Sequence, residues 1–552
     1  MYRPVAILLL ASPAWAQFQT AQQQYPPYQT AEDQVQDVAA DQQHGVARIS
    51  VAQGDVNVKR GDNAQLTGAI VNAPLMTRDR LETSPGSRAE VQFDGANLIR
   101  LGPNTDLGFA NLAYQRYQVQ LGIGSVIVRV VRVSQAQLEI DTPSVGFRPL
   151  SQGEYRISVF DNGTSQVSVR SGRLEMSGPR GSQVVNQGQS LLVRGDSADP
   201  EFQPSYEVPR DQLDDWSASR DSELLSARSP QYVSSDIYGA EDLDRYGSWV
   251  PSQYGQVWTP QTQAADWSPY SNGQWTYADY YGWTWVDYEP WGWAPYHYGR
   301  WFWNTGYGWC WWPGARGGYG YRWSPALVSF FGFGGGLGWV SLAPYESFHP
   351  WWGRGYRSFD SFRGSDIGRY YRNAGVRGGA MTAGFGAFGG AGHSYRVATR
   401  GDLGNADLYR GRVPISPNTG SYRFSDRQVV SNSRVSQPAA RPFFSRQQQQ
   451  QTASPATGWQ RFGSSGYAAP QRQQSFASRP NGNSNESGWH SFGQPQAQAA
   501  SRYNYNYRAT PSMPRYSAPS APSFRGNNGG GGGHSSGGGH PAGGGGGGHR
   551  GR

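Results

Sequence analysis

The segment Gly273-Gln-Trp-Thr-Tyr-Ala-Asp-Tyr-Tyr-Gly-Trp-Thr-Trp285 carries the pattern that decides the fold of half of this chain. Its Gly-x-Trp start recurs at a 26-residue step, at Trp249, Trp275 and Trp301. Each copy is followed by Tyr-Gly and, three residues after that glycine, by a further tryptophan: Trp258, Trp285 and Trp311. Such a repeat is typical of small two-stranded units that bury their aromatic faces against their neighbours. The sequence therefore predicts an ordered Trp-rich domain of tandem β-hairpins over residues 243–352.

A second β domain is predicted before it, over residues 44–195. Short runs of alternating apolar and polar residues, such as Arg88-Ala-Glu-Val-Gln-Phe93 and Tyr155-Arg-Ile-Ser-Val-Phe160, are separated by turn residues. Asp94-Gly95 and Asp161-Asn-Gly163 supply the positive-φ positions that tight hairpins need. We therefore expect a mainly β protein whose first domain is an all-β sandwich or roll. Residues 196–242 are predicted to be an acidic linker with a short helix.

The two ends of the chain are predicted to be disordered or removed. A basic start, an apolar run over residues 5–11 and the motif Ala14-Trp-Ala16 indicate a signal peptide over residues 1–16, cleaved after Ala16. A Gln-rich disordered leader follows over residues 17–43. Residues 353–552 hold 24 Arg against 6 Asp and Glu, and too few apolar residues to offset chain entropy. We expect this segment to be a disordered basic tail behind an acidic body.

These features predict a periplasmic or secreted protein. No later stretch is long and apolar enough to suggest a membrane span, because glycines interrupt the uncharged residues 323–345 and indicate strands joined by a glycine turn. The single cysteine, Cys310, cannot form a disulfide within the chain, and its tryptophan neighbours indicate a buried free thiol.

The first domain resembles the FecR family in a series of blocks that run in the family's order. They are Gly54-Asp-Val-Asn-Val58, Leu81-Glu-Thr-Ser-Pro-Gly-Ser-Arg-Ala-Glu-Val-Gln-Phe-Asp-Gly95, Ile99-Arg-Leu-Gly-Pro-Asn-Thr105, Leu121-Gly-Ile-Gly124, Asp141-Thr-Pro143 and Gly153-Glu-Tyr-Arg-Ile-Ser-Val159. The resemblance implies an all-β fold in the periplasm. In the founding members of the family this domain relays a signal from an outer-membrane transporter to a sigma factor, through a membrane helix that this sequence lacks.

The second half resembles a tryptophan-rich domain of unknown function that often follows FecR-like domains in exported bacterial proteins. The matching residues include Asp242-Leu-Asp-Arg-Tyr-Gly-Ser-Trp249, Tyr281-Gly-Trp-Thr-Trp-Val-Asp287 and Glu289-Pro-Trp-Gly-Trp-Ala-Pro-Tyr-His-Tyr-Gly-Arg-Trp301. This resemblance implies an architecture and supplies no activity.

The tryptophans allow two interpretations: a hairpin core, or an exposed stripe of rings that grips sugars. If residues 283–293 are strands, Trp283 and Trp285 share one face, as do Trp291 and Trp293. Nearby polar residues would then take the sugar hydroxyls. The candidate binding residues are Trp283, Trp285, Trp291, Trp293, Trp301, Asp287, Glu289, His297 and Arg300.

The sequence offers no enzyme site. Asp287 and Glu289 lie two residues apart, whereas the two carboxylates of a glycosidase usually come from separate elements on either side of the scissile bond. The histidines are scattered and make no metal-ligand spacing, so no metal or cofactor is expected.

We therefore expect a non-enzymatic exported envelope protein that binds or scaffolds envelope material, either glycan or protein. One alternative is a FecR-like sensory or regulatory component that acts with a partner. The other is binding of an anionic polymer, nucleic acid or acidic polysaccharide, through the basic tail.

Overall fold

A computed structural model describes residues 43–261, 263–264, 266–314, 322–353, 359–389, 395–429, 442–445 and 490–491. The chain divides into two compact units, Met1–Gln494 and Pro495–Arg552, and every described residue belongs to the first. The predicted signal peptide, most of the predicted leader and most of the predicted tail lie outside the described residues.

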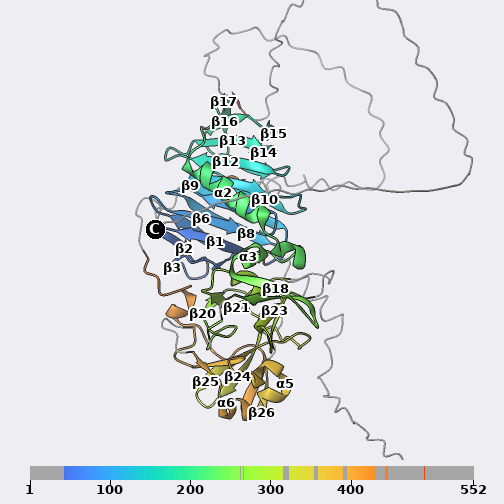
Figure 1. Cartoon of the computed structure of the whole chain (residues 1–552). Coiled ribbons are helices and arrows are strands. Elements are labelled where there is room, and N and C mark those ends of the chain that lie inside the picture. Colours follow the sequence, from blue (N-terminus) through green and yellow to red (C-terminus); the bar gives the residue numbers. More distant parts are fainter. Residues whose placement is uncertain are drawn as a thin grey trace, which may run out of the picture. The chain divides into compact units, whose positions relative to one another are not determined.

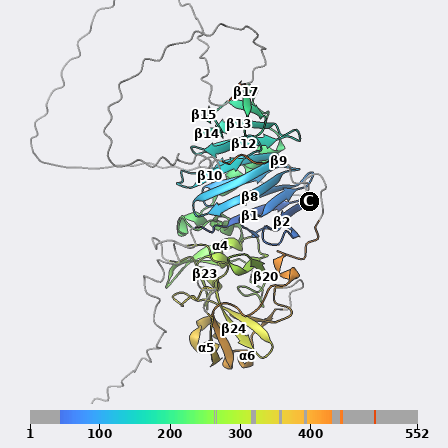
Figure 2. The ribbon, with the colours of Figure 1, turned by 180° about the vertical axis from the view of Figure 1, so that it is seen from behind.

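The first domain, residues 43–205, is built from strands stacked side by side, with β17 at one end (Figures 1 and 2). These strands are β1 (Ala47–Gln53), β2 (Val56–Lys59), β3 (Leu66–Gly68), β4 (Pro74–Leu75), β5 (Arg80–Thr83), β6 (Arg88–Gln92), β7 (Asn97–Leu101), β8 (Asp106–Ala113), β9 (Arg116–Val130), β10 (Gln137–Asp141), β11 (Gly146–Pro149), β12 (Gly153–Val159), β13 (Ser165–Ser171), β14 (Arg173–Gly178), β15 (Gly181–Asn186), β16 (Ser190–Arg194) and β17 (Glu201–Ser205).

Strand β9 belongs to both sheets of this domain. Its first half pairs with β8 and, in parallel, with β10, in a sheet ordered β3-β2-β5-β8-β9-β10-β11-β14-β15. Its second half pairs with β7 and β12 in the other sheet, ordered β4-β1-β6-β7-β9-β12-β13-β16-β17. The change of sheet occurs at Gly124. Its φ of 97° is a backbone conformation that glycine adopts with little strain.

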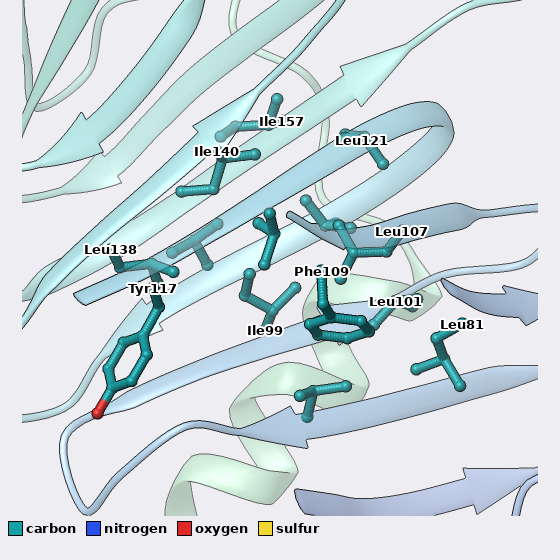
Figure 3. Close-up of a cluster of buried hydrophobic side chains, with 14 of the residues drawn as sticks. Leu81, Ile99, Leu101, Leu107, Phe109, Tyr117, Leu121, Leu138, Ile140 and Ile157 are labelled. Atoms are coloured by element: carbon teal, nitrogen blue, oxygen red, sulfur yellow. The ribbon is translucent and has the colours of Figure 1, made fainter. Parts of the chain in front are cut away.

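Aliphatic and aromatic side chains from both sheets form one core (Figure 3). The residues include Leu81, Ile99, Leu107, Phe109, Leu121 and Ile140, and all of them are nearly or fully buried. Along strands such as β9 and β12, every second residue points into this core, which is the period-2 pattern expected of strands that bury one face. The prediction of a mainly β protein with an all-β first domain is confirmed.

Helix α2 (Gln212–Ser226) covers the outer face of the second sheet. Its N-cap, Asp211, accepts hydrogen bonds from the backbone N–H groups of Leu213 and Asp214. Below the helix, the buried carboxylate of Glu90 accepts hydrogen bonds from Arg100 Nε at 2.8 Å and Arg220 Nη2 at 2.8 Å. Burial raises the pKa of Glu90, but the charges and hydrogen bonds of Arg220 and Arg100 outweigh it, so the pKa falls to about 2.

The Trp-rich domain begins with the short helix α3 (Leu243–Tyr246) and continues as a series of hairpins. Its strands are β18 (Gly247–Ser252), β19 (Gly255–Pro260), β20 (Gly273–Ala278), β21 (Gly282–Asp287), β22 (Arg300–Asn304), β23 (Gly308–Trp312), β24 (Val328–Phe333) and β25 (Gly336–Ser341), with helix α4 (Trp293–His297) between β21 and β22. Strands β18, β19, β23 and β22 form one sheet, and β20 with β21 forms another.

The repeat is explained by how each hairpin is paired. Within a hairpin the two tryptophans of the repeat lie directly opposite each other: Trp249 with Trp258, Trp275 with Trp285, and Trp301 with Trp311. The Tyr-Gly glycine makes the turn with a φ of 92°, 66° or 75° at Gly255, Gly282 and Gly308. The first glycine makes room for a ring, because a Cβ on Gly247, Gly273 or Gly299 would lie 2.4–2.6 Å from the second tryptophan of its hairpin.

The folded part extends beyond residue 352, which corrects the predicted boundary of the tail. Strands β26 (Phe359–Ser365), β27 (Ala380–Gly384), β28 (Arg396–Val397) and β29 (Ala406–Gly411) join β24 and β25 in a six-stranded sheet, with helices α5 (Ile367–Tyr370) and α6 (Arg400–Gly404) beside it. The tail sequence alone does not predict this sheet, because part of the apolar core that its strands share comes from the Trp-rich domain. Phe331 and Val340 share a buried cluster with Ile367 and Leu408.

After β29 the chain returns to the first domain. Residues 415–427, which we call the strap, first follow β20: Thr276 Oγ1 donates to Ser421 O at 2.9 Å and Gln274 Nε2 donates to Arg423 O at 3.0 Å. Phe424 is fully buried in the core of the first domain, with Arg60 above its ring at 5.0 Å. The strap therefore holds both domains. A final strand, β30 (His490–Ser491), pairs with β17.

Cys310 is a buried free thiol, as predicted. Burial raises its pKa to about 11, so the thiol stays protonated near neutral pH. Within the described residues, no helix combines the length and the apolar character needed to span a bilayer.

We expect Gly273→Ala to lower the free energy of unfolding by about 1–3 kcal/mol, because the new Cβ overlaps the Trp285 ring. Gly306→Ala is the matched control, since the nearest atom to its Cβ is 3.5 Å away. Urea unfolding followed by tryptophan fluorescence measures both. Equal stability of the two variants would contradict the role given to the first glycine of the repeat.

Phe424→Ala should cost about 3–5 kcal/mol, because it leaves a cavity in the core of the first domain. Phe385→Ala removes the same ring from a position that is 45% exposed and should cost little. The measurement is the thermal unfolding midpoint of the full chain. A Phe424→Ala protein as stable as the control would show that the strap does not hold the domain.

Glu90→Gln should destabilise the protein by about 3–5 kcal/mol at neutral pH, because it removes the fully buried carboxylate from the ion pairs of Arg100 and Arg220 and leaves them only Asp221 and Glu223. The folded pKa of Glu90 lies below its unfolded value, so its contribution is complete above about pH 5 and is lost as the pH falls towards 2. The stability difference between wild type and variant, measured by urea unfolding, should therefore narrow over that range. A difference that is constant with pH would contradict this assignment.

Candidate functional site

The predicted aromatic stripe is not exposed. Trp283, Trp285, Trp291, Trp293 and Trp301 are each at most 4% exposed. Both faces of β21 are covered, since Thr284 between the first two tryptophans is fully buried as well. Trp291 and Trp293 do not lie on a strand, because Trp293 begins helix α4. The structure therefore supports the core interpretation and contradicts an exposed platform at these rings.

Hydrogen bonds fix most of these rings inside the domain. The indole N–H of Trp283 donates to Ile415 O at 3.2 Å, and that of Trp301 donates to Pro295 O at 2.9 Å. Trp291 instead packs against the Trp258 ring, with centroids 4.8 Å apart. Burial and partnered N–H groups are typical of structural aromatic residues.

The Asp287 and Glu289 carboxylates serve local structure. Asp287 is fully buried and accepts hydrogen bonds from Trp285 Nε1 and from the backbone N–H of Glu289, both at 2.9 Å. Burial raises the pKa of Asp287 well above its ordinary value, against the lowering effect of these hydrogen bonds. The Glu289 carboxylate accepts a hydrogen bond from Asn272 Nδ2 at 2.8 Å. A substrate could not reach both carboxylates at once.

His297 and Arg300 are also directed into the fold. His297 Nδ1 donates to Ser324 O at 2.8 Å, and its ring stacks on Trp323 with centroids 4.8 Å apart. Burial lowers the pKa of His297 to about 3, so the imidazole is neutral. Arg300 Nη1 donates to Gly299 O at 2.8 Å, and its guanidinium lies 5.9 Å from the Phe348 ring centre.

The structure instead forms an aromatic cleft where the first domain meets the Trp-rich domain. Its volume is about 350 Å³. One wall comes from the first domain and consists of the turn around Asp94, the turn around Tyr114 and the residues after β9. The opposite wall comes from the linker and the Trp-rich domain. The aromatic lining consists of Phe93, Tyr114, Tyr117, Tyr238, Tyr281, Tyr298 and Trp323.

Hydrogen bonds across the junction hold the floor of this aromatic cleft. Tyr238 donates its hydroxyl proton to Val46 O at 2.9 Å, and Tyr281 donates to His44 O at 2.7 Å. Close by, Arg48 of the first domain pairs with Asp242. Because these bonds join the first domain to the linker and to the Trp-rich domain, the shape of the cleft depends on how these parts are held together.

The rim of the aromatic cleft is polar and more accessible. Tyr114 is 46% exposed, and the Arg322 guanidinium lies 5.4 Å from its ring centre. Arg132 and Asp236 stand at the edge as exposed residues of opposite charge. The buried Trp323 Nε1 has no hydrogen-bond partner among the described residues, so it is a donor that a ligand or water could use.

None of the nine candidate residues predicted from sequence lines this cleft. The repeat identified Tyr281 as part of a Tyr-Gly turn and the family resemblance covered the neighbouring hairpin, but the opposite wall comes from turns of the first domain. No local pattern marks Tyr114 or Arg132 as a partner of Trp323.

Comparisons with known families agree with this two-domain architecture. Residues 79–184 match the family described as FecR protein, and residues 240–346 match a family of unknown function, DUF6600. The chain therefore carries a FecR domain followed by a domain of unknown function, which confirms the resemblances. The FecR match supports a regulatory or sensory role and an association with the cell envelope. No curated protein matches this chain.

Two crystal structures of a putative anti-sigma factor from Parabacteroides distasonis ATCC 8503, at 2.50 Å and 1.65 Å resolution, are similar to part of the chain. Each is 15% identical over 23% of this chain, with a TM-score of 0.21. The chain spans 59% of the length of those proteins.

Proposed function

We propose that this chain, with its FecR domain and its DUF6600 domain, is an exported non-enzymatic protein that binds envelope glycan in the aromatic cleft. The observation that carries the proposal is that both domains line one cleft with aromatic rings and place charged groups at its rim. On this proposal the predicted signal peptide, cleaved after Ala16, brings the protein to the periplasm or the cell exterior.

The chemistry of the aromatic cleft suits a sugar. A ring that is half exposed, as Tyr114 is, can cover the apolar face of a pyranose, and a tyrosine hydroxyl can donate or accept a hydrogen bond. Arg132 and Asp236 at the rim offer a donor and an acceptor for sugar hydroxyls, and a charged partner strengthens such bonds. A mostly aromatic wall with a few polar groups and a volume of about 350 Å³ is typical of small-ligand sites.

Binding in this position would connect the two domains. A ligand that touches the Tyr114 turn and Trp323 together stabilises the domains in the arrangement that forms the cleft, by its differential affinity for that arrangement. This gives a physical route from ligand binding to a sensory output. The same binding would let the protein scaffold envelope material without catalysing a reaction.

A regulatory protein partner is a second candidate, and the FecR domain is the observation that favours it. The two proposals are compatible, since a partner could recognise the domain arrangement that the glycan stabilises. Co-purification from envelope extracts tests this candidate: recovery of the same protein with wild type, and its loss when the aromatic cleft is altered, would support it.

The direct test is binding of the full mature chain to soluble peptidoglycan fragments and to an acidic polysaccharide, measured by isothermal titration calorimetry. Tyr114→Ala should weaken binding about tenfold, as expected for one aromatic contact of roughly 1.4 kcal/mol. Tyr206→Ala is the matched control, because Tyr206 is 95% exposed and lies outside the aromatic cleft. Trp323→Phe keeps a ring and removes the unpaired N–H, and should weaken binding less.

No binding by wild type, or an equal loss in Tyr114→Ala and Tyr206→Ala, would refute the proposal. Binding that falls steeply with salt and is unchanged by Tyr114→Ala would instead assign the interaction to the basic tail.

A further inference from the structure

A short segment of the predicted tail is docked on the first domain. It comprises residues 442–445 of the sequence Arg441-Pro-Phe-Phe-Ser-Arg446. The Phe444 side chain is 2% exposed, and its backbone N–H donates to Thr142 O at 3.1 Å. A phenylalanine this far from the folded domains in sequence has no local reason to be buried, so the burial reports a specific contact.

Two glycines of the first domain make room for the phenylalanine rings. A Cβ on Gly146 would lie 3.0 Å from Phe444 Cδ1, and a Cβ on Gly122 would lie 3.7 Å from Phe443 Cζ. Neither glycine has a positive φ, so the backbone alone does not call for glycine at these positions. Their missing side chains leave space for the two rings on the sheet face formed by the neighbouring strands β9, β10 and β11, and we call this space the groove.

The chemistry around the groove suits an extended polypeptide. The Thr142 carbonyl offers an acceptor to a backbone N–H, as peptide-binding sites commonly do. The carboxylates of Asp106 and Asp141 lie 3.2 Å and 3.1 Å from the Cβ positions built on Gly122 and Gly146. Both are buried and partnered within the domain, because Asp106 pairs with Arg80 and Asp141 accepts a hydrogen bond from Gln118.

This contact is much smaller than that of the strap. Phe424 belongs to the core of the first domain, and the strap around it is held by Arg427, which donates to Ala69 O at 3.2 Å. Residues 442–445 have one buried ring and one backbone hydrogen bond to the domain. A small contact whose ligand is tethered to the same chain is held mainly by its effective concentration, and a free ligand of the same kind can replace it.

We propose that the groove formed by Gly122, Thr142 and Gly146 is a recognition site for an extended Phe-Phe segment, and that the tail fills it as an internal competitor. The external ligand is a partner polypeptide that presents the same aromatic pair in extended form. Its binding releases the tail from the FecR domain, so the groove couples partner recognition to the position of the basic tail. This inference is independent of glycan binding in the aromatic cleft.

The test uses the full-length chain and a fluorescent peptide with the sequence of residues 439–448. Fluorescence anisotropy should show binding to the Phe444→Ala chain, whose groove is vacated. Wild type should bind the peptide at least about tenfold more weakly, because its own segment competes at a high effective concentration. A peptide carrying the Phe444→Ala change should not bind either chain.

A second variant ties the binding to the groove. Adding Gly146→Ala to the Phe444→Ala chain places a methyl group 3.0 Å from the position of the ring, closer than ordinary contact, and should weaken peptide binding, while circular dichroism confirms that the chain still folds. Gly384→Ala is the matched control, because its Cβ would have no neighbour within 4 Å. Absence of binding to the Phe444→Ala chain, equal binding to it and to wild type, or an equal affinity of the Gly146→Ala and Gly384→Ala variants would overturn the proposal.

Discussion

The packing of one tryptophan ring over a glycine, inside a two-stranded hairpin, is the contact on which the Trp-rich domain depends. The turn glycine sets the register, the register places two tryptophans opposite each other, and the missing side chain of the first glycine leaves space for the second ring. A hairpin alone is at best marginally stable in water, so each unit must bury its rings against the next. Trp275 accordingly contacts Trp285 of its own hairpin as well as Phe330 and Trp339 of another.

This dependence explains why the tryptophans are not a binding surface. A ring that holds two hairpins together cannot also face solvent, and its N–H is used on backbone carbonyls such as Pro295 O. The proposed binding site therefore lies at the edge of the aromatic core, where the hairpins meet a domain with a different core. Tyr114 and Trp323 lie at that edge, one on each side. The aromatic cleft forms because the separately packed cores of the first domain and the Trp-rich domain end next to each other.

The sequence predicted what short-range patterns determine and missed what long-range contacts determine. The hairpins follow from glycine and tryptophan spacing, the first domain follows from strand alternation, and the buried thiol of Cys310 follows from its neighbours. The strap could not be predicted from the sequence, because Phe424 contacts Thr67, 357 residues away in the chain. Nothing in the sequence near Phe424 distinguishes it from the other isolated aromatic residues of the tail. Strands β26 to β29 were missed for a related reason: low apolar content argues against a core only if the segment has to build that core alone. The aromatic cleft could not be predicted either, because its walls are turns that lie far apart in the sequence and carry no shared local pattern.

The return of the chain to the first domain changes what the basic tail can do. An arginine-rich segment tethered only at its start would act as an independent electrostatic arm. Here the strap anchors it beside β3 through Phe424 and Arg427, and a second, smaller contact seats Phe444 beside β11. The first contact is part of a core and is lost only when the domain unfolds, whereas the second is small enough to exchange. The FecR domain thus contacts two other parts of the chain, the Trp-rich domain beside the aromatic cleft and residues 442–445 in the groove. A ligand bound at either proposed site would act on the same β-sheet framework, because β9 runs from the sheet that carries Gly122 into the sheet that carries Arg129, which pairs with Asp221 of α2.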